Sequence, residues 1–175
     1  MERLLAARLV GIVRLDDLEL TVDVASLALD AGLQVVEVTF TLPSAGRAIE
    51  RLRRDHPGAL VGAGSVRRLT ELEDAAAAGA QFLVAPGLNP ELIDAAARRG
   101  LPMLPGVFTA TEVDLGLRLG AELLKLFPGR AQRPRLRSFD AAALPGCEPR
   151  SDRRHIRGQR DCLSEGGRGR GRDGV

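Results

Sequence analysis

The regular alternation of short apolar runs with longer amphipathic runs is the feature that most constrains this chain. Between residues 9 and 128, β-branched runs recur about every 20 to 25 residues, and stretches with helical apolar spacing separate them. Strands that alternate with helices at this spacing form right-handed βαβ units around a parallel sheet. The predicted strands are LVGIVR (9–14), QVVEVTF (34–40), LVGAG (60–64), QFLVA (81–85), PMLPG (102–106) and ELLKLF (122–127).

Two predicted helices carry recognisable end signals. The helix within 89–100 is expected to begin with Asn89 as its N-cap and Pro90 at its first position. The helix within 16–32 is expected to end at Gly32. Its predicted apolar face consists of Leu18, Val22, Ala25, Leu27 and Leu29.

Six strand–helix units suit either an open doubly wound sheet or part of an eight-stranded (β/α)8 barrel. No GxGxxG motif follows the first strand, and GAGS (62–65) lacks the later glycine and the acidic partner of a dinucleotide site. The 175 residues, 45% hydrophobic and 27% charged, indicate a globular domain rather than a disordered chain.

Several other classes of protein are disfavoured by simple counts. The chain has no uninterrupted run of 18 apolar residues, and Arg3, Arg8 and Arg14 interrupt its apolar opening, so neither a membrane span nor a signal peptide is predicted. We therefore expect a cytoplasmic protein. The two cysteines, Cys147 and Cys162, have no metal-ligand spacing and indicate neither a zinc site nor a disulfide framework.

The single lysine of the chain lies inside an apolar strand. Lys125 is the one lysine among 25 basic residues, and the run ELLKLF around it predicts a buried strand. Burial disfavours the charged form of an amine, and a neutral amine can condense with a ketone to form a Schiff base. The alternative is a structural lysine that reaches solvent at the strand end or pairs with Glu122.

A second polar residue interrupts the apolar strand VVEVTF. Because side chains alternate between the two faces of a strand, Glu37 shares a face with Thr39, and Lys125 shares one with Phe127. If both faces point into a barrel, a carboxylate and an amine meet in one interior. A carboxylate beside an imine-forming lysine can shuttle the protons of Schiff-base chemistry. A buried salt bridge between Glu37 and Lys125 is the alternative.

Five short segments follow one another between about residue 5 and residue 128, and they are GLQVVEVTFTLPSA, LVGAGSV, FLVAPGLNPEL, LPMLPGVFTATE and LLKLFP. Their order and intervals resemble those of the 2-keto-3-deoxy-6-phosphogluconate (KDPG) and 4-hydroxy-2-oxoglutarate (KHG) aldolases. The resemblance implies a class I aldolase, a lyase of Entner–Doudoroff carbohydrate metabolism. Such an enzyme has a (β/α)8 barrel, is usually a homotrimer, and splits a 2-keto acid into pyruvate and an aldehyde. Neither a metal nor an organic cofactor is implied.

The same resemblance implies roles for individual residues. Lys125 would form the Schiff base with the keto carbon, and Glu37 would be the general acid and base. The residues that would bind substrate are Thr41, Ser65, Pro86, Gly87 and Phe127.

Two of these positions depart from the family pattern. Ser65 stands where the family usually has a threonine near the pyruvate. Thr41 stands where the family commonly has the arginine that holds the substrate carboxylate. Among the others, Pro86 and Gly87 would shape the pocket, and Phe127 would pack on the pyruvyl methyl group. The identity of the sugar acid and of the released aldehyde is left open by Thr41.

The composition changes after residue 128. Residues 129–175 hold 12 Arg and 8 Gly in 47 positions, and the PTGG motif of the family's seventh strand is absent. We hypothesise that residues from about 133 are translated out of frame. A shift of one base permits PTGGI from 151–156, VNLV from 147–150 and AVAVG from 167–171. The nucleotide sequence of the gene decides this hypothesis, because its codons must permit these readings.

The expected organisation is therefore a partial barrel at 1–132 and an out-of-frame or disordered tail at 133–175. A six-strand barrel leaves its first and sixth strands unpaired, which predicts poor solubility and little turnover. Two other functions remain open, an inactive barrel remnant and an Arg/Gly tail that binds nucleic acid by charge. Salt-sensitive retention of single-stranded RNA by 129–175 would identify the second.

Overall fold

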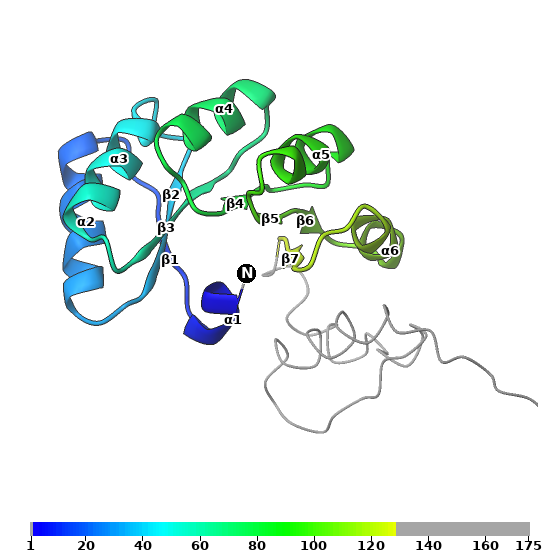
Figure 1. Ribbon diagram of the computed structural model, residues 1–175, viewed down its shortest axis with the longest axis horizontal. Helices are drawn as coiled ribbons and strands as arrows, with labels where there is room; N and C mark the ends of the chain where they lie inside the picture. The colour runs from blue at the N-terminus through cyan, green and yellow to red at the C-terminus, as the bar shows by residue number, and fades with distance from the viewer. Residues whose placement is uncertain (1, 129–175) are drawn as a thin grey trace, which may run out of the picture. The chain divides into compact units, whose positions relative to one another are not determined.

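The computed structural model describes residues 2–128 of the chain, which divides into two units, Met1–Phe127 and Pro128–Val175. Helices and strands alternate along the described residues (Figure 1). Their order is α1 (Glu2–Ala7), β1 (Gly11–Val13), α2 (Leu18–Asp30), β2 (Val35–Thr39), α3 (Ala45–Asp55), β3 (Leu60–Gly64), α4 (Leu69–Ala77), β4 (Leu83–Val84), α5 (Pro90–Arg98), β5 (Met103–Leu104), β6 (Gly106–Val107), α6 (Ala110–Arg118) and β7 (Lys125–Leu126).

All strand pairs of the described residues are parallel. One sheet has the order β1-β2-β3-β4-β5, and β6 pairs with β7 in a second sheet. β5 and β6 are two pieces of one predicted strand, and Pro105 separates them. Proline has no N–H to donate, so its carbonyl alone takes part in pairing, and it accepts a hydrogen bond of 2.9 Å from the Lys125 N–H. The predicted six-unit arrangement of the (β/α) barrel type is confirmed.

The predicted strand edges are also present within residues 2–128. There β1 pairs with β2 alone, and β7 pairs with β6 alone. Ile12 of the edge strand β1 is 52% exposed, whereas its pairing partner Glu37 in β2 is buried. Such an edge presents unpaired backbone groups and apolar side chains to its surroundings.

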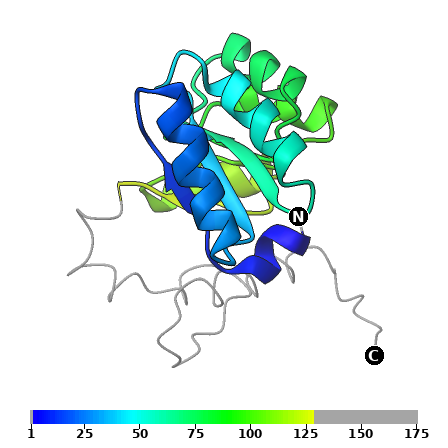
Figure 2. The same cartoon turned by 90° about the vertical axis from the view of Figure 1, so that its left-hand side faces the viewer.

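The helices from α2 to α6 lie along one face of the strands (Figures 1 and 2). The larger core lies between these helices and the sheet, because alternate strand residues point toward the helices. Its fully buried large side chains include Val36, Val38, Val61, Leu83, Ile49, Leu52, Leu72 and Leu92.

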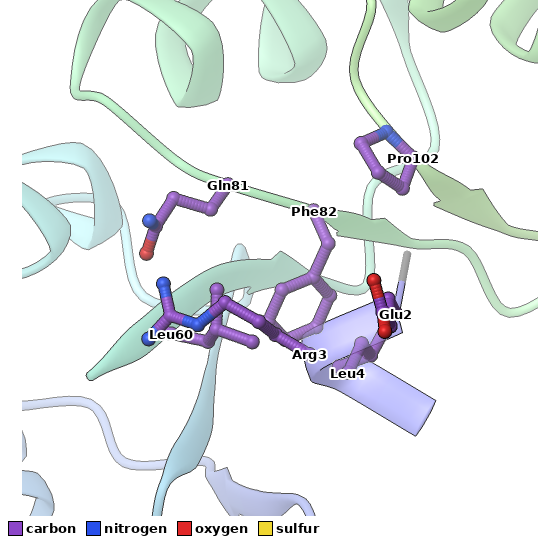
Figure 3. Close-up of a pocket in the computed structure, with 7 residues that line it drawn as sticks. All are labelled: Glu2, Arg3, Leu4, Leu60, Gln81, Phe82 and Pro102. Carbon is purple, nitrogen blue, oxygen red and sulfur yellow. The ribbon is translucent and has the colours of Figure 1, made fainter. Parts of the chain in front are cut away.

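A smaller core lies on the other, inner face of the strands. Val35, Phe82 and Val84 project there and pack with Leu4 of α1. Figure 3 shows Leu4 beside Phe82 at a small pocket near the beginnings of β3 and β4. The sequence analysis did not predict α1, which is further held by a 2.6 Å hydrogen bond from Arg3 Nη2 to the Gly58 carbonyl.

One residue of the predicted α2 face is placed wrongly. Leu27 is 69% exposed, whereas Thr21 is buried and its hydroxyl donates to the Asp17 carbonyl at 2.6 Å. A helix turns about 100° per residue, so Leu27 lies about 180° from Leu18 around the axis. The expected end of the helix is confirmed, since Gly32 follows its last turn with a φ of +100°.

Several sequence predictions fall outside the described residues. These are the domain boundary at 132, the out-of-frame segment 133–175, and the two cysteines. Within residues 2–128, no helix is both long enough and apolar enough to cross a membrane.

Candidate active site

The candidate site lies at the carboxyl ends of the parallel strands. A polar residue, a proline or an aromatic ring stands within two residues after the end of each strand. Arg14 follows β1, Thr41 follows β2, Ser65 follows β3, Pro86 follows β4 and Phe127 follows β7. Barrel enzymes carry their chemistry on this edge, because loops after the strands can vary without disturbing the packed layers below.

Glu37 and Lys125 meet on the inner face of the strands. Lys125 Nζ lies 3.7 Å from Glu37 Oε1, and their side chains are 23% and 3% exposed. Glu37 is in β2, opposite Gly62 of β3, and Lys125 is in β7, opposite Gly106 of β6. The fold thus brings together the acid and the amine that the sequence analysis paired.

The surroundings of Lys125 differ from two sequence-based possibilities. The strand around Lys125 is half-buried rather than buried, because β7 is an edge among the described residues. Glu122, the alternative partner, is exposed, and the ion pair of Lys125 within residues 2–128 is made with Glu37.

The Glu37 carboxyl has an unusual electrostatic environment. Burial raises the pKa of Glu37 above its usual value, and the charges of Lys125 and Arg14 oppose that shift. Within residues 2–128, Glu37 Oε1 has no hydrogen-bond partner. A carboxyl that is buried, incompletely hydrogen-bonded and beside an amine is suited to accept and return a proton.

Phe127 lies near the Lys125 amine, and Gly106 pairs with Lys125 along the strand. Lys125 Nζ lies 5.6 Å from the centroid of the Phe127 ring, which is within cation–π range. A Cβ on Gly106 would overlap the Pro86 carbonyl and the Gly87 nitrogen. Pro86 and Gly87 therefore lie against the strand residue that pairs with Lys125.

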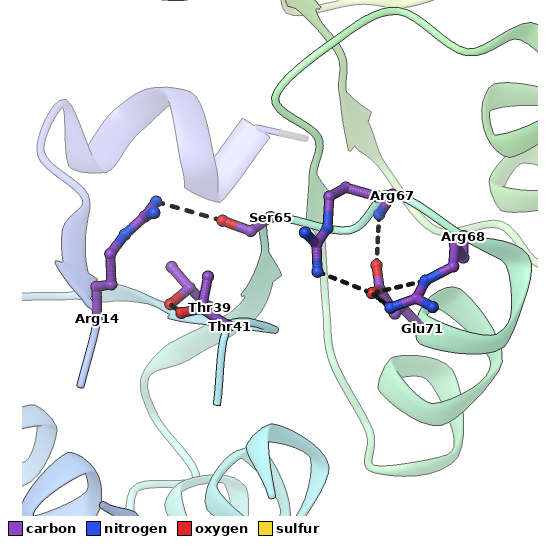
Figure 4. A network of polar contacts seen from close by, with 7 residues as sticks. All are labelled: Arg14, Thr39, Thr41, Ser65, Arg67, Arg68 and Glu71. Atoms are coloured by element: carbon purple, nitrogen blue, oxygen red, sulfur yellow. Dashed lines mark hydrogen bonds and ion pairs between the residues drawn. The ribbon is translucent and has the colours of Figure 1, made fainter. Parts of the chain in front are cut away.

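Ser65 holds a backbone conformation that is rare for a residue with a side chain. Its φ is +58°, and its hydroxyl accepts a 3.3 Å hydrogen bond from Arg14 Nη2 (Figure 4). Such strain is found mostly where a site requires it. Thr41 lies two residues after the end of β2, and its hydroxyl oxygen is 2.8 Å from the hydroxyl oxygen of Thr39. The Thr39 hydroxyl also donates to the Val13 carbonyl.

A carboxylate fixes the loop that follows Ser65. Glu71 of α4 accepts hydrogen bonds from the Arg67 N–H at 2.6 Å and from Arg68 Nη2 at 3.0 Å, as Figure 4 shows. Burial alone would raise the pKa of Glu71, but the hydrogen bonds from Arg67 and Arg68 lower it below its usual value. The ionised carboxylate thus stabilises the turn that holds Ser65.

Arg14 is a site residue that the sequence analysis missed as such. It was noted only as a charge that interrupts the apolar N-terminal run. Its position directly after a predicted strand was the available signal, because strand ends of βα units meet at one edge. Arg14 supplies a guanidinium that donates to the Ser65 hydroxyl at this edge.

Comparison of the sequence with known proteins identifies its family. The family model "KDPG and KHG aldolase" matches residues 1–141. The chain belongs to the KDPG/KHG aldolase family. The 2-dehydro-3-deoxy-phosphogluconate aldolase of Treponema pallidum is 36% identical over 127 residues, which are 73% of this chain and 60% of that protein. This family member therefore spans only about 60% of the length of such relatives.

Solved structures of the family resemble the fold of this chain. The KDPG aldolase of Zymomonas mobilis, solved with 3-phosphoglycerate, is 35% identical with a TM-score of 0.69, covering 77% of this chain and 65% of that one. The Legionella pneumophila KDPG aldolase is 34% identical with a TM-score of 0.66, covering 70% and 59%. In that crystal, pyruvate was captured as a covalent carbinolamine intermediate.

Proposed function

We propose that this family member is a class I aldolase. It cleaves a 2-keto-3-deoxy-6-phospho sugar acid or 4-hydroxy-2-oxoglutarate to pyruvate and an aldehyde. The observation that carries the proposal is the 3.7 Å approach of Lys125 Nζ to the buried carboxyl of Glu37. The pyruvate carbinolamine reported for the Legionella pneumophila enzyme supports it.

The proposed chemistry begins at the amine. Neutral Lys125 Nζ attacks the C2 carbonyl carbon of the keto acid, and the carbonyl oxygen takes up a proton to give a carbinolamine. Glu37 protonates the departing hydroxyl, water leaves, and an iminium ion forms.

Cleavage follows from the positive charge of the iminium nitrogen. The ionised Glu37 carboxylate removes the proton of the C4 hydroxyl, the C3–C4 bond breaks, and the aldehyde leaves. The bonding electrons form an enamine. The Glu37 carboxyl returns this proton to C3 of the enamine, and water hydrolyses the resulting iminium ion, which releases pyruvate and regenerates the amine of Lys125.

The substrate carboxylate needs a partner, and Thr41 cannot provide a positive charge. We propose that Arg14 and the Ser65 hydroxyl bind it, since Arg14 Nη2 already reaches Ser65 Oγ. Pro86, Gly87 and Phe127 would border the pyruvyl part of the substrate. A chain with this site would need neither metal nor organic cofactor.

Borohydride trapping tests the proposal. The full chain is incubated with pyruvate and sodium borohydride, and the modified residue is located by mass spectrometry. We expect a reduced adduct at Lys125 and none in the Lys125→Arg variant. A folded sample that acquires no adduct would favour an inactive barrel remnant over an aldolase.

The assembly and location of the protein belong to the same proposal. We propose a homotrimer in the cytoplasm, in agreement with the family resemblance. Analytical ultracentrifugation of the full chain would measure the first. Nucleic-acid binding by the Arg/Gly-rich residues 129–175 was the alternative function. These residues lie outside the part of the chain that the structure describes.

A further inference from the structure

Strand β3 has glycine, and so no side chain, at two neighbouring positions of its inner face. Gly62 and Gly64 alternate with Val61 and Ala63, which point into the core under the helices. Neither glycine has the positive φ that would itself require glycine. The backbone of β3 would therefore accept alanine at both positions, so the reason for glycine lies in what occupies the space.

The two glycines make room for two different side chains. A Cβ on Gly64 would overlap the Oε1, Cγ and Cδ atoms of Glu37. A Cβ on Gly62 would instead overlap three ring atoms of Phe82. Phe82 is a rigid ring, 2% exposed and packed in the inner core, whereas the end of Glu37 can rotate about its side-chain bonds.

Few other contacts hold the Glu37 carboxyl where it lies. Within residues 2–128 its Oε1 has no hydrogen-bond partner, and its nearest charge is Lys125 Nζ at 3.7 Å. A carboxyl with an oxygen that no hydrogen bond fixes takes the position that the surrounding surfaces leave open. The bare backbone of β3 at Gly64 is the surface that leaves this position open.

We propose that Gly64 is a positioning residue of the aldolase site, because the absence of its side chain determines where the Glu37 carboxyl meets Lys125. The proposal rests on the proposed function and adds a residue to it. Any side chain at position 64 would turn the Glu37 carboxyl away from the amine while β3 kept its backbone and its pairing with β2.

The decisive comparison is between Gly64→Ala and Gly62→Ala in the full chain. We expect Gly64→Ala to slow borohydride trapping of pyruvate at Lys125 by about 100-fold, because a catalytic group misplaced by about 1 Å loses that much. Its melting temperature should fall little, because Glu37 can move. Gly62→Ala should behave in the opposite way, with a large fall in melting temperature and little change in the rate of trapping by the folded protein.

A second measurement reads the position of Glu37 without any chemistry. Titration of the Glu37 carboxyl by carbon NMR senses the charges of Lys125 and Arg14, which both lower its pKa in the wild type. The Lys125→Met substitution should raise the Glu37 pKa clearly in the wild type but little in Gly64→Ala, because the displaced carboxyl no longer lies beside the amine. If the wild type forms no adduct, the proposed function fails, yet this titration still decides the role of Gly64.

Two results would overturn the inference. One is a Gly64→Ala protein that traps pyruvate at the wild-type rate and whose Glu37 pKa responds to Lys125→Met as strongly as in the wild type. The other applies if Gly64→Ala does not fold. In that case the double variant Gly64→Ala/Glu37→Ala should regain stability, because the overlapped atoms are gone, and a double variant as unstable as the single one would refute the steric argument.

Discussion

Replacement of Lys125 by methionine should separate the electrostatic role of this residue from its chemical one. In the wild type, the amine lies 3.7 Å from Glu37 Oε1, and the Glu37 side chain is only 3% exposed. Methionine keeps an apolar chain of similar length but leaves the carboxylate without its nearest positive charge. Lys125→Arg is the matched control, because it keeps the charge and removes the primary amine.

The magnitude follows from Coulomb's law. Two unit charges 3.7 Å apart attract by about 4.5 kcal/mol at an effective dielectric constant of about 20. Part of this attraction is offset in the wild type by the cost of removing the Lys125 amine from water, since its side chain is only 23% exposed. The variant limits its loss further, because Glu37 can take up a proton. We therefore expect Lys125→Met to lower the free energy of unfolding by about 2–4 kcal/mol near pH 8.

The pH dependence of this loss has a definite sign. Burial already raises the pKa of Glu37, and removal of Lys125 takes away a charge that lowers it, so the pKa rises further in the variant. The penalty is therefore complete at pH values above the folded pKa and declines as pH falls through it. At pH values below the usual Glu pKa of 4.5, the carboxyl is protonated in the folded and unfolded chain, and the penalty vanishes.

Urea unfolding of the full chain at pH 4 and pH 8 measures this effect. Lys125→Arg should stay close to the wild type at both pH values and should form no pyruvate adduct. The reasoning would be refuted if Lys125→Met were as stable as Lys125→Arg at pH 8. It would be refuted equally by a loss of stability that persisted unchanged at pH 4.

Two further predictions concern the loop after β3. Ser65→Gly and Ser65→Ala should both weaken pyruvate trapping, because each removes the hydroxyl that accepts a hydrogen bond from Arg14. In urea unfolding the glycine variant should be more stable than the alanine variant by about 1 kcal/mol, because alanine keeps a Cβ at a φ of +58°. Equal stability of the two would mean that residue 65 carries no strain. Glu71→Gln should lower the free energy of unfolding by about 1–3 kcal/mol at neutral pH, because it weakens charge-assisted hydrogen bonds to Arg67 and Arg68. Since the pKa of Glu71 is lowered, the wild-type advantage should be present above pH 4.5 and disappear as pH falls through the folded pKa, and a difference independent of pH would contradict this.

Local patterns were sufficient to predict most elements of the fold. Six strand segments and the parallel βα order followed from periodicity, and the Asn89–Pro90 start of α5 followed from capping chemistry. The failures were also local. Leu27 was assigned to the buried face of α2 although its angular position opposes it, and α1 was overlooked because the apolar N-terminal run was judged only as a membrane or export signal.

The sequence by itself determined which residues could do chemistry. A lone lysine and an isolated glutamate within apolar strands identified Lys125 and Glu37, because charged groups in such runs are costly unless they are paired or functional. Their separation could not be deduced, since it depends on the register and curvature of strands far apart in the chain.

Only the tertiary structure decided how the site is arranged around that pair. It placed Arg14 beside Ser65 and the Glu37 carboxyl over Gly64. Such relations depend on distances of a few ångströms between segments that share no local pattern. Periodicity specifies which face a side chain occupies, whereas packing between strands specifies what it meets there.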